Sequence, residues 1–315
     1  MNSIIIARRG PLGPLIGIAV ALGCLMSASS ALAGLKIVAT LPDLAAIARQ
    51  IGGDEVEVSA LASPFEDPHY VDPKPSHIVA LNQADMLILN GLELEAGWLP
   101  PLQSQARNAA VSVGGAGVVD VSKLVRLLEK PAGQVSRAQG DIHSGGNPHY
   151  TFDPRAMAQA GVAIGNKMAE LDPAHADVYR RRAVALADSL LVFAREQRAR
   201  FDKLPRDKRR IVAYHGSLIY LNDWLGLDEV ATIEPKPGVS PNPSHVSQVL
   251  EVVRTQRVGV ILQERHYPQK TSQTLSRLAQ VRLVVIDGAT RFEEGEGYLD
   301  HLKRIAEEVH HALDH

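Results

Sequence analysis

Short apolar segments alternate with amphipathic segments along most of the chain. Residues 35–41 (LKIVATL) form a β-branched apolar run that is typical of a buried strand, and residues 43–51 carry apolar side chains at helical spacing before two glycines. Because parallel strands are joined by crossover helices, this alternation predicts a parallel sheet covered by helices. The other strands expected in this half of the chain are residues 56–61, 86–89 and 118–121.

The same alternation returns after residue 205. Short apolar runs again follow amphipathic stretches, although the two halves show no obvious sequence repetition. The chain is therefore expected to form an α/β fold of two lobes, each with a mainly parallel four-stranded sheet flanked by helices. The expected strands of the second lobe are residues 211–214, 230–233, 258–262 and 283–286, and its expected helices include residues 244–256 and 270–279.

A long helix is expected between the two lobes. Residues 174–203 contain no Gly or Pro, and apolar side chains recur at helical spacing among Arg, Ala and Asp. About 30 residues at 1.5 Å each would make a rod of roughly 45 Å, long enough to join two lobes rigidly. We expect an N-terminal lobe at residues 34–172, a linking helix at 173–203 and a C-terminal lobe at 204–315. A long surface helix of one domain is the alternative that this pattern leaves open.

The first 33 residues have the features of a signal peptide. Arg8-Arg9 precedes an apolar stretch at residues 12–26, and Ala31-Leu32-Ala33 has the small-x-small pattern that a signal peptidase cuts. The apolar stretch is shorter than the roughly 20 residues that span a bilayer, so export to the periplasm is favoured over a membrane anchor. Cys24 offers lipid attachment as a less favoured alternative.

Composition excludes several classes of function. Cys24 is the one cysteine of the chain, so a metal site in the folded body must use nitrogen and oxygen ligands. The formal net charge is −2, and no basic stripe is interleaved with aromatic residues, so nucleic-acid binding is not expected. A Gly-rich phosphate loop of the Walker type is absent from the sequence, and ATP hydrolysis is therefore not expected either.

Four short segments each end on a plausible metal ligand, and these ligands lie 66 to 80 residues apart in the sequence. Two follow Pro-containing turns, and two come directly after predicted strands, beyond which ligands collect in open α/β sheets. If the segments converge, three imidazoles and one carboxylate would suit a closed, four-coordinate zinc site. Each residue taken alone is more often engaged in ordinary hydrogen bonds. The segments are Glu66-Asp67-Pro68-His69, Asn147-Pro148-His149, Ala213-Tyr214-His215 and Val285-Ile286-Asp287.

Residues 129–147 are low in large apolar side chains and contain four glycines with Ser, Gln and Pro. This composition predicts a flexible surface loop. Asp141 and His143 within it could capture a metal transiently, but one His and one Asp favour a plain loop over a metal-binding one.

The order and spacing of these motifs resemble the cluster A-I metal-binding proteins of ABC transporters, and the chain is most similar to their zinc-binding branch. The resemblance covers nearly the whole chain after the signal peptide. Besides the segments of His69, His149, His215 and Asp287, the matching motifs are Pro73-Lys74-Pro75, Asn90-Gly91 through Trp98-Leu99, Asp153-Pro154, Ile233-Glu234-Pro235-Lys236-Pro237-Gly238 and Pro243-Ser244-His245.

The resemblance implies two α/β lobes bridged by a long helix, with the metal between them. His69 and His149 match the ligands that the family draws from its N-terminal lobe, and His215 and Asp287 match those from its C-terminal lobe. Manganese-preferring relatives usually have a carboxylate where this chain has His215. Three nitrogens and one oxygen favour Zn²⁺ over Mn²⁺, since carboxylate-rich sites suit harder ions.

Two departures from the family pattern affect what is expected. Many zinc-binding relatives carry a long loop rich in His and Asp before the second ligand, and here Asp141 and His143 are its remnants, so metal scavenging by this loop is not expected. The family usually has Asp where this chain has His77, at the start of a predicted helix. We expect His77 to be a helix cap or a surface residue, and not a ligand.

The expected function is that of a monomeric periplasmic receptor with no enzymatic activity. It would capture Zn²⁺ with high affinity and deliver it for import to an ABC-transporter permease powered by a separate ATPase. Whether a periplasmic metallochaperone loads the site is left open.

Two other functions stay as alternatives. A zinc-dependent hydrolase would need the fourth zinc position free for water, with Glu66 or Asp67 as general base. If Asp287 occupies that position, the site is closed and suits a receptor; if it does not, the site is open and suits a hydrolase. The sequence has no His-Glu-x-x-His motif, which disfavours the common class of zinc peptidases. A surface adhesin with a structural zinc is the other alternative.

Overall fold

The computed structural model describes residues 34–130 and 143–314, and the chain from Leu35 onward forms one compact unit. The predicted signal peptide, Cys24 and Asp141 lie outside the described residues. Among the helices of the described part, none is both long and apolar enough to cross a membrane.

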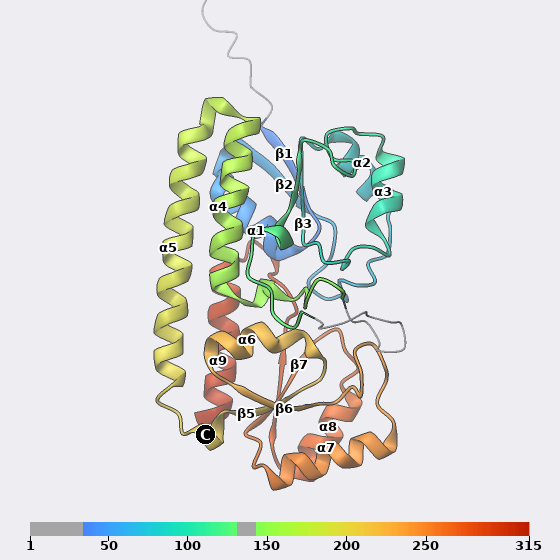
Figure 1. Cartoon of the computed structure of the whole chain (residues 1–315), viewed down its shortest axis with the longest axis vertical. Helices are drawn as coiled ribbons and strands as arrows, with labels where there is room; N and C mark the ends of the chain where they lie inside the picture. The colour runs from blue at the N-terminus through green and yellow to red at the C-terminus, as the bar shows by residue number, and fades with distance from the viewer. Residues whose placement is uncertain (1–33, 131–142, 315) are drawn as a thin grey trace, which may run out of the picture. The chain divides into compact units, whose positions relative to one another are not determined.

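The first sheet consists of four parallel strands in the order β2-β1-β3-β4 (Figure 1). Its register places Leu35 opposite Val56 and Ala39 opposite Ala60. The strand order reverses between β1 and β3, where a parallel sheet opens a crevice beyond its carboxyl ends. The strands are β1 (Leu35–Ala39), β2 (Val56–Ala60), β3 (Met86–Leu89) and β4 (Val118–Asp120), and the helices of this lobe are α1 (Pro42–Gly52), α2 (Pro75–Gln83), α3 (Leu99–Ala106) and α4 (Pro154–Leu171).

The second sheet repeats this topology in the order β6-β5-β7-β8, again with all strands parallel. The prediction of two parallel four-stranded sheets flanked by helices is therefore confirmed, and the strand bounds differ from the expected ones by at most two residues at either end. The strands are β5 (Arg210–Ala213), β6 (Asp228–Thr232), β7 (Val260–Glu264) and β8 (Arg282–Ile286), and the helices are α6 (Ile219–Leu225), α7 (Pro243–Thr255), α8 (Lys270–Ala279) and α9 (Tyr298–Asp314).

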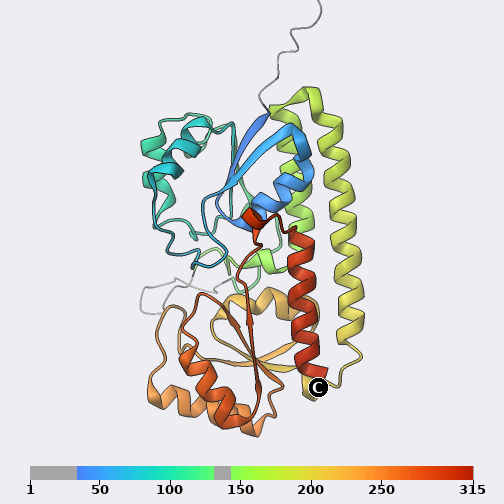
Figure 2. The same cartoon turned by 180° about the vertical axis from the view of Figure 1, so that it is seen from behind.

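The predicted long helix is α5 (Ala176–Phe201), whose 26 residues make a rod of about 39 Å. It packs along α4 and α1 of the first lobe and against α6 and α9 of the second. Figure 2 shows α9 and α5 side by side. The helix thus contacts both lobes, and the division of the chain at residues 172–173 and 203–204 stays a prediction.

The partner of the long helix, α4, is not predicted by the sequence pattern. Its Gly161 and Gly165 weaken the helical signal, since Gly in a helix interior costs about 1 kcal/mol relative to Ala. Close packing explains why residue 165 is a glycine, because a Cβ there would lie 2.6 Å from the Cβ of Ala183 on α5. The helices approach each other closely at this point.

One hydrophobic core runs through most of the chain. It includes Ile37 and Ile88 of the first sheet, Leu190 of α5, Leu262 of the second sheet and Ile305 of α9. A smaller core on the other face of the second sheet packs Val212 and Ile261 with residues of α7 and α8. The two lobes therefore share apolar packing on the side of the long helices.

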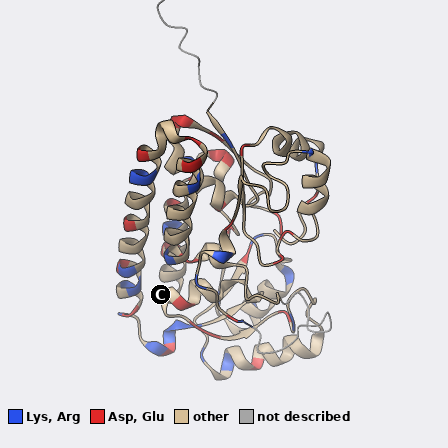
Figure 3. Cartoon of the chain, turned by 45° about the horizontal axis from the view of Figure 1, so that its top comes forward, with Lys and Arg blue, Asp and Glu red and all other residues tan. Residues whose placement is uncertain are grey.

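Charged residues of both signs occur along the elements of the described chain. Figure 3 shows Lys and Arg alternating with Asp and Glu along the long helices, with neither sign confined to one element. This distribution agrees with the near-neutral formal net charge of −2.

Candidate metal centre

Two turns of the first lobe present His69 and His149 in the same way. Oδ1 of Asp67 accepts the backbone N–H of His69 at 3.0 Å and lies 2.7 Å from its Nδ1. Oδ1 of Asn147 accepts the backbone N–H of His149 at 3.0 Å and lies 2.9 Å from its Nδ1. Each Asx side chain therefore fixes both the turn and the imidazole two residues later.

His215 is placed by the second sheet. It follows the carboxyl end of β5, beside β7, at the point where the order of that sheet reverses. Its Nδ1 lies 2.7 Å from Oε2 of Glu234, which follows β6 and also accepts the backbone N–H of Gly238 at 3.0 Å. A carboxylate thus orients this imidazole from the neighbouring strand.

All three imidazoles have an oxygen acceptor on Nδ1. These hydrogen bonds place the hydrogen of a neutral ring on Nδ1 and leave Nε2 as the lone-pair nitrogen. A ligating His in a metal protein has this arrangement, because the bonded N–H fixes the tautomer and the ring orientation. The oriented imidazoles are those of His69, His149 and His215.

The structure brings these three rings together. The ring centroids of His69 and His149 are 5.2 Å apart, those of His149 and His215 are 5.5 Å apart, and those of His69 and His215 are 6.1 Å apart. Three imidazoles on one tetrahedral zinc would have centroids about 5 Å apart, given Zn–N bonds of about 2.0–2.1 Å. In the described residues, however, no three His, Cys, Asp or Glu side chains are placed closely enough to hold a metal ion as they stand.

Asp287, the fourth predicted ligand, is engaged elsewhere. It follows β8, the edge strand beyond β7, and its side chain is 0% exposed. Its carboxylate lies 2.7 Å from Arg265, 2.7 Å from Arg291 and 3.0 Å from Arg304. Burial alone would raise the pKa of Asp287, but these three guanidiniums outweigh it and hold the pKa below its ordinary value. Coordination by Asp287 stays a prediction.

Of the two roles expected for His77, the structure shows the helix cap and not the surface position. The backbone N–H of Lys74 donates to its Nδ1 at 3.4 Å at the start of α2, and the residue is buried.

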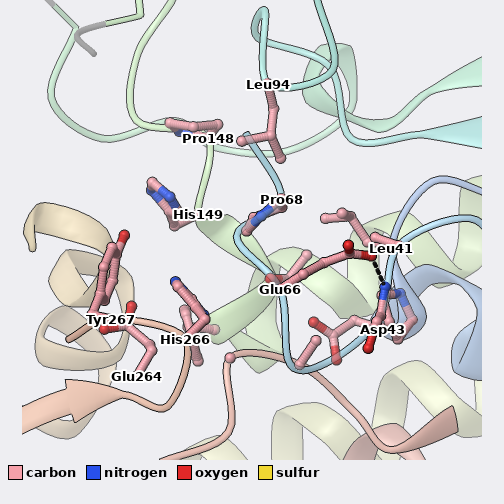
Figure 4. Close-up of a pocket in the computed structure, with 17 residues that line it drawn as sticks. Leu41, Asp43, Glu66, Pro68, Leu94, Pro148, His149, Glu264, His266 and Tyr267 are labelled. Carbon is pink, nitrogen blue, oxygen red and sulfur yellow. Dashed lines mark hydrogen bonds between the residues drawn. The ribbon is translucent and has the colours of Figure 1, made fainter. Parts of the chain in front are cut away.

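A small cavity lies beside His149. It has a volume of about 30 Å³, room for roughly one or two waters, and is lined by residues from both lobes, among them His149, Glu264 and His266. Figure 4 shows these side chains near Tyr267 on one side of the cavity, with Glu66 and Asp43 on the other. Two buried atoms here have no hydrogen-bond partner in the described chain, Oε2 of Glu264 and Nδ1 of His266.

Three further residues of this region were not singled out as site residues by the sequence. Glu264 and His266 are at the end of β7, where the expected strand stops two residues early, and Glu234 was noted only as part of a longer motif.

His143 lies against His69, with 3.2 Å between the two Nε2 atoms and 5.3 Å between the ring centroids. The Asx-Pro-His signal that marks His69 and His149 does not precede His143 or His266.

The surroundings shift the pKa values of the histidines in opposite directions. Burial, with the charges of His69 and His215 when protonated, holds the pKa of His149 well below its ordinary value. Burial would also lower the pKa of His215, but the hydrogen bond to Glu234 and the nearby Glu264 carboxylate outweigh it and raise the pKa. Proton and metal therefore compete more strongly at His215 than at His149.

The model of the family described as zinc-uptake complex component A, periplasmic, matches residues 37–312 of the chain. The chain belongs to this family. The iron-binding protein YfeA of Yersinia pestis is 26% identical over 242 residues, which cover 77% of this chain and 73% of YfeA. The manganese ABC transporter substrate-binding lipoprotein PsaA of Streptococcus pneumoniae is 24% identical over 287 residues, which cover 89% of each protein.

The fold of the chain is similar to a solved structure of ZnuA. The TM-score is 0.75 at 23% sequence identity, and the match covers 89% of this chain and 99% of the ZnuA chain. Members of the family are substrate-binding receptors of ABC transporters and not enzymes. This chain is accordingly a receptor for a divalent metal that works outside the cytoplasm with a membrane permease, and the hydrolase alternative is excluded.

Proposed function

We propose that the chain is a zinc receptor whose primary ligands are His69, His149 and His215. The observation that supports this proposal is a hydrogen bond shared by all three imidazoles. In each ring Nδ1 is bonded to an oxygen acceptor, which leaves Nε2 for a metal. His175 also has a carboxylate oxygen 2.7 Å from Nδ1, but its Nε2 lies 3.2 Å from Glu55. The three proposed ligands differ because their rings come together, with centroids 5.2–6.1 Å apart.

The donor set favours zinc over the metals in the names of the two relatives. YfeA is named for iron and PsaA for manganese. Imidazole nitrogen suits zinc, copper, nickel and iron, whereas Mn²⁺ prefers carboxylate and carbonyl oxygen. Zinc is favoured over iron because a given nitrogen site binds Zn²⁺ more tightly than Fe²⁺. The sequence model of the family, which is named for zinc uptake, points the same way. Supply in the periplasm would then decide between zinc and copper, which binds such sites more tightly.

The receptor would act after export. Cleavage after Ala33 would release it into the periplasm, where it would capture Zn²⁺ and deliver it to an ABC-transporter permease. Several relatives are named as lipoproteins, so attachment of lipid at Cys24 is the competing fate of the N-terminus. Mass measurement of the exported protein distinguishes an intact chain from Gly34 from a shorter cut that leaves an acylated Cys24.

Metal analysis of the protein, expressed without an affinity tag and purified without chelator, tests the proposal. We expect about one zinc per chain in the wild type, tighter binding of zinc than of manganese in competition titrations, and loss of zinc in His149→Ala. His175→Ala is the matched control, because His175 precedes α5 and pairs with Asp172 at 2.7 Å. Zinc retained by His149→Ala, or manganese bound more tightly than zinc, would contradict the proposal.

A further inference from the structure

Two arrangements of this metal site differ in the residue that supplies the fourth ligand. In one of them the ligand is Asp287. In the structure, Asp287 makes close ion pairs with Arg265, Arg291 and Arg304, which come from three different segments. Bringing its carboxylate to a metal beside His215 would leave these guanidiniums without their shared partner. The guanidiniums are partly exposed and Arg304 also pairs with Glu296, but the carboxylate itself is buried and would lose three close partners. A ligand that is already beside the imidazoles therefore has an advantage.

His143 is such a ligand. Its Nε2 lies 3.2 Å from Nε2 of His69. Two nitrogens bound to one tetrahedral zinc are about 3.3 Å apart, given Zn–N bonds of about 2.0–2.1 Å. The spacing of this pair is therefore that of two imidazoles that share a single metal, as well as that of two imidazoles that share a hydrogen.

The other two imidazoles face the same space. A cavity of about 70 Å³ is lined by His143, His149 and His215, together with Glu129 and Pro237. Since His143 contacts His69 and lines this cavity with the other two, it is adjacent to all three primary ligands.

Neighbouring contacts hold the backbone of His143 in place. The hydroxyl of Ser144 donates to Glu93 at 2.7 Å, and the backbone N–H of Gly146 donates to the carbonyl of His143 at 3.3 Å. Asn147 donates from its backbone to Leu128 at 3.0 Å. The residues that follow His143 are thus fixed to the first lobe, close to the Asx turn of His149.

We propose that His143 supplies the fourth ligand of the metal centre, so that four imidazoles bind the metal. Asp287 then keeps its arginine partners in the metal-bound state and acts in the structure of the second lobe. This inference rests on the zinc site proposed above. It also sharpens the preference of the site for Zn²⁺ over Mn²⁺, because Mn²⁺ prefers carboxylate oxygen and an all-nitrogen donor set offers none.

Zinc affinity of three variants of the full chain tests the inference, measured by competition with a chelator of known affinity. His143→Gln should weaken zinc binding at least tenfold, and Asp287→Asn should change it less than threefold. His149→Ala should lose zinc in either arrangement. Loss of zinc in His149→Ala with unchanged affinity in His143→Gln would overturn the fourth-ligand assignment alone, whereas zinc retained in His149→Ala would overturn the site itself.

A structure of the zinc-loaded wild type decides the question without substitutions, since Asp287→Asn could unfold the second lobe by unpairing its arginines. We expect Nε2 of His143 at about 2.0–2.1 Å from the zinc. A zinc bound by Asp287 with His143 turned away would refute the inference.

Discussion

Oε2 of Glu234 lies 2.7 Å from Nδ1 of His215, although the two residues are 19 positions apart and follow adjacent strands. This carboxylate raises the pKa of His215 against the opposing effect of burial. Because only the neutral imidazole binds metal, zinc affinity should begin to fall at a pH above 6.5, the ordinary His value, and continue to fall as the pH decreases.

Glu234 has two effects on His215: it raises the pKa of the imidazole and it orients the ring. Replacing Glu234 by Gln should change both, with separate results. The pKa of His215 falls in Glu234→Gln, so the loss of zinc affinity with decreasing pH should start at a lower pH. The affinity at pH 8 should drop roughly 10- to 100-fold, because the amide orients the imidazole less strongly. Zinc titrations between pH 5 and 8.5 measure both, with the exposed Glu251→Gln on α7 as control. An unchanged pH profile in Glu234→Gln would contradict this account of His215.

The stability of the metal-free protein should decrease in mild acid because of His149. Its pKa is held well below the ordinary value when folded, so below about pH 6.5 the unfolded chain binds a proton that the folded chain does not. This single group lowers the free energy of unfolding by at most about 1.4 kcal/mol per pH unit as the pH falls. His149→Gln should flatten that dependence in urea unfolding at pH 7.5 and 5.5 with chelator present. If the free energy of unfolding of His149→Gln changed with pH as much as that of the wild type, groups other than His149 would control the acid sensitivity.

Zinc should stabilise the folded protein by linkage. The primary ligands come from both lobes, and the unfolded chain has no preformed site, so zinc at 100 times its Kd should add about 2.7 kcal/mol to the free energy of unfolding. The melting temperature should rise accordingly in a thermal scan of the wild type and stay unchanged in His149→Ala. A wild-type melting temperature that is insensitive to excess zinc would count against a site shared between lobes.

The two glycines of α4 provide a matched pair for the packing of the long helices. Gly165→Ala should lower the free energy of unfolding by about 1–3 kcal/mol, because its Cβ would meet Ala183 at 2.6 Å and the carbonyl of Tyr179 at 3.2 Å. Gly161→Ala should be neutral or stabilising by up to about 1 kcal/mol, because its Cβ would make only ordinary contacts at 3.7–3.9 Å. Urea unfolding measures both, and zinc affinity should not change. Equal effects of the two substitutions would show that helix propensity and not helix contact controls this position.

The fold could be predicted from sequence because its strands are short, buried and separated by amphipathic helices. Residues 86–89 and 270–279 were expected with the bounds that the structure gives, since Gly, Pro or polar residues flank them. The helix α4 escaped prediction because close packing against α5 requires the glycine that weakens its pattern. Intrinsic propensity and tertiary contact oppose each other there.

The candidate site was predictable in part. His69 and His149 carry a local signal, the Asx-Pro pair directly before each, and His215 comes two residues after a strand, so each is marked by its neighbours in sequence. The partners of Asp287 have no such mark, because Arg265, Arg291 and Arg304 come from a strand end, a loop and a helix. The contact of His143 with His69 joins residues 74 positions apart and likewise depends on tertiary structure.

The paired Asx turns that precede His69 and His149 have a kinetic consequence. Their hydrogen bonds form when the chain folds, so the rotational freedom of both rings is lost before any ion arrives. Such preorganisation increases affinity mainly through slow dissociation. We expect a receptor of this kind to release its cargo slowly when unassisted. We therefore expect delivery to require the permease to break one of these turns.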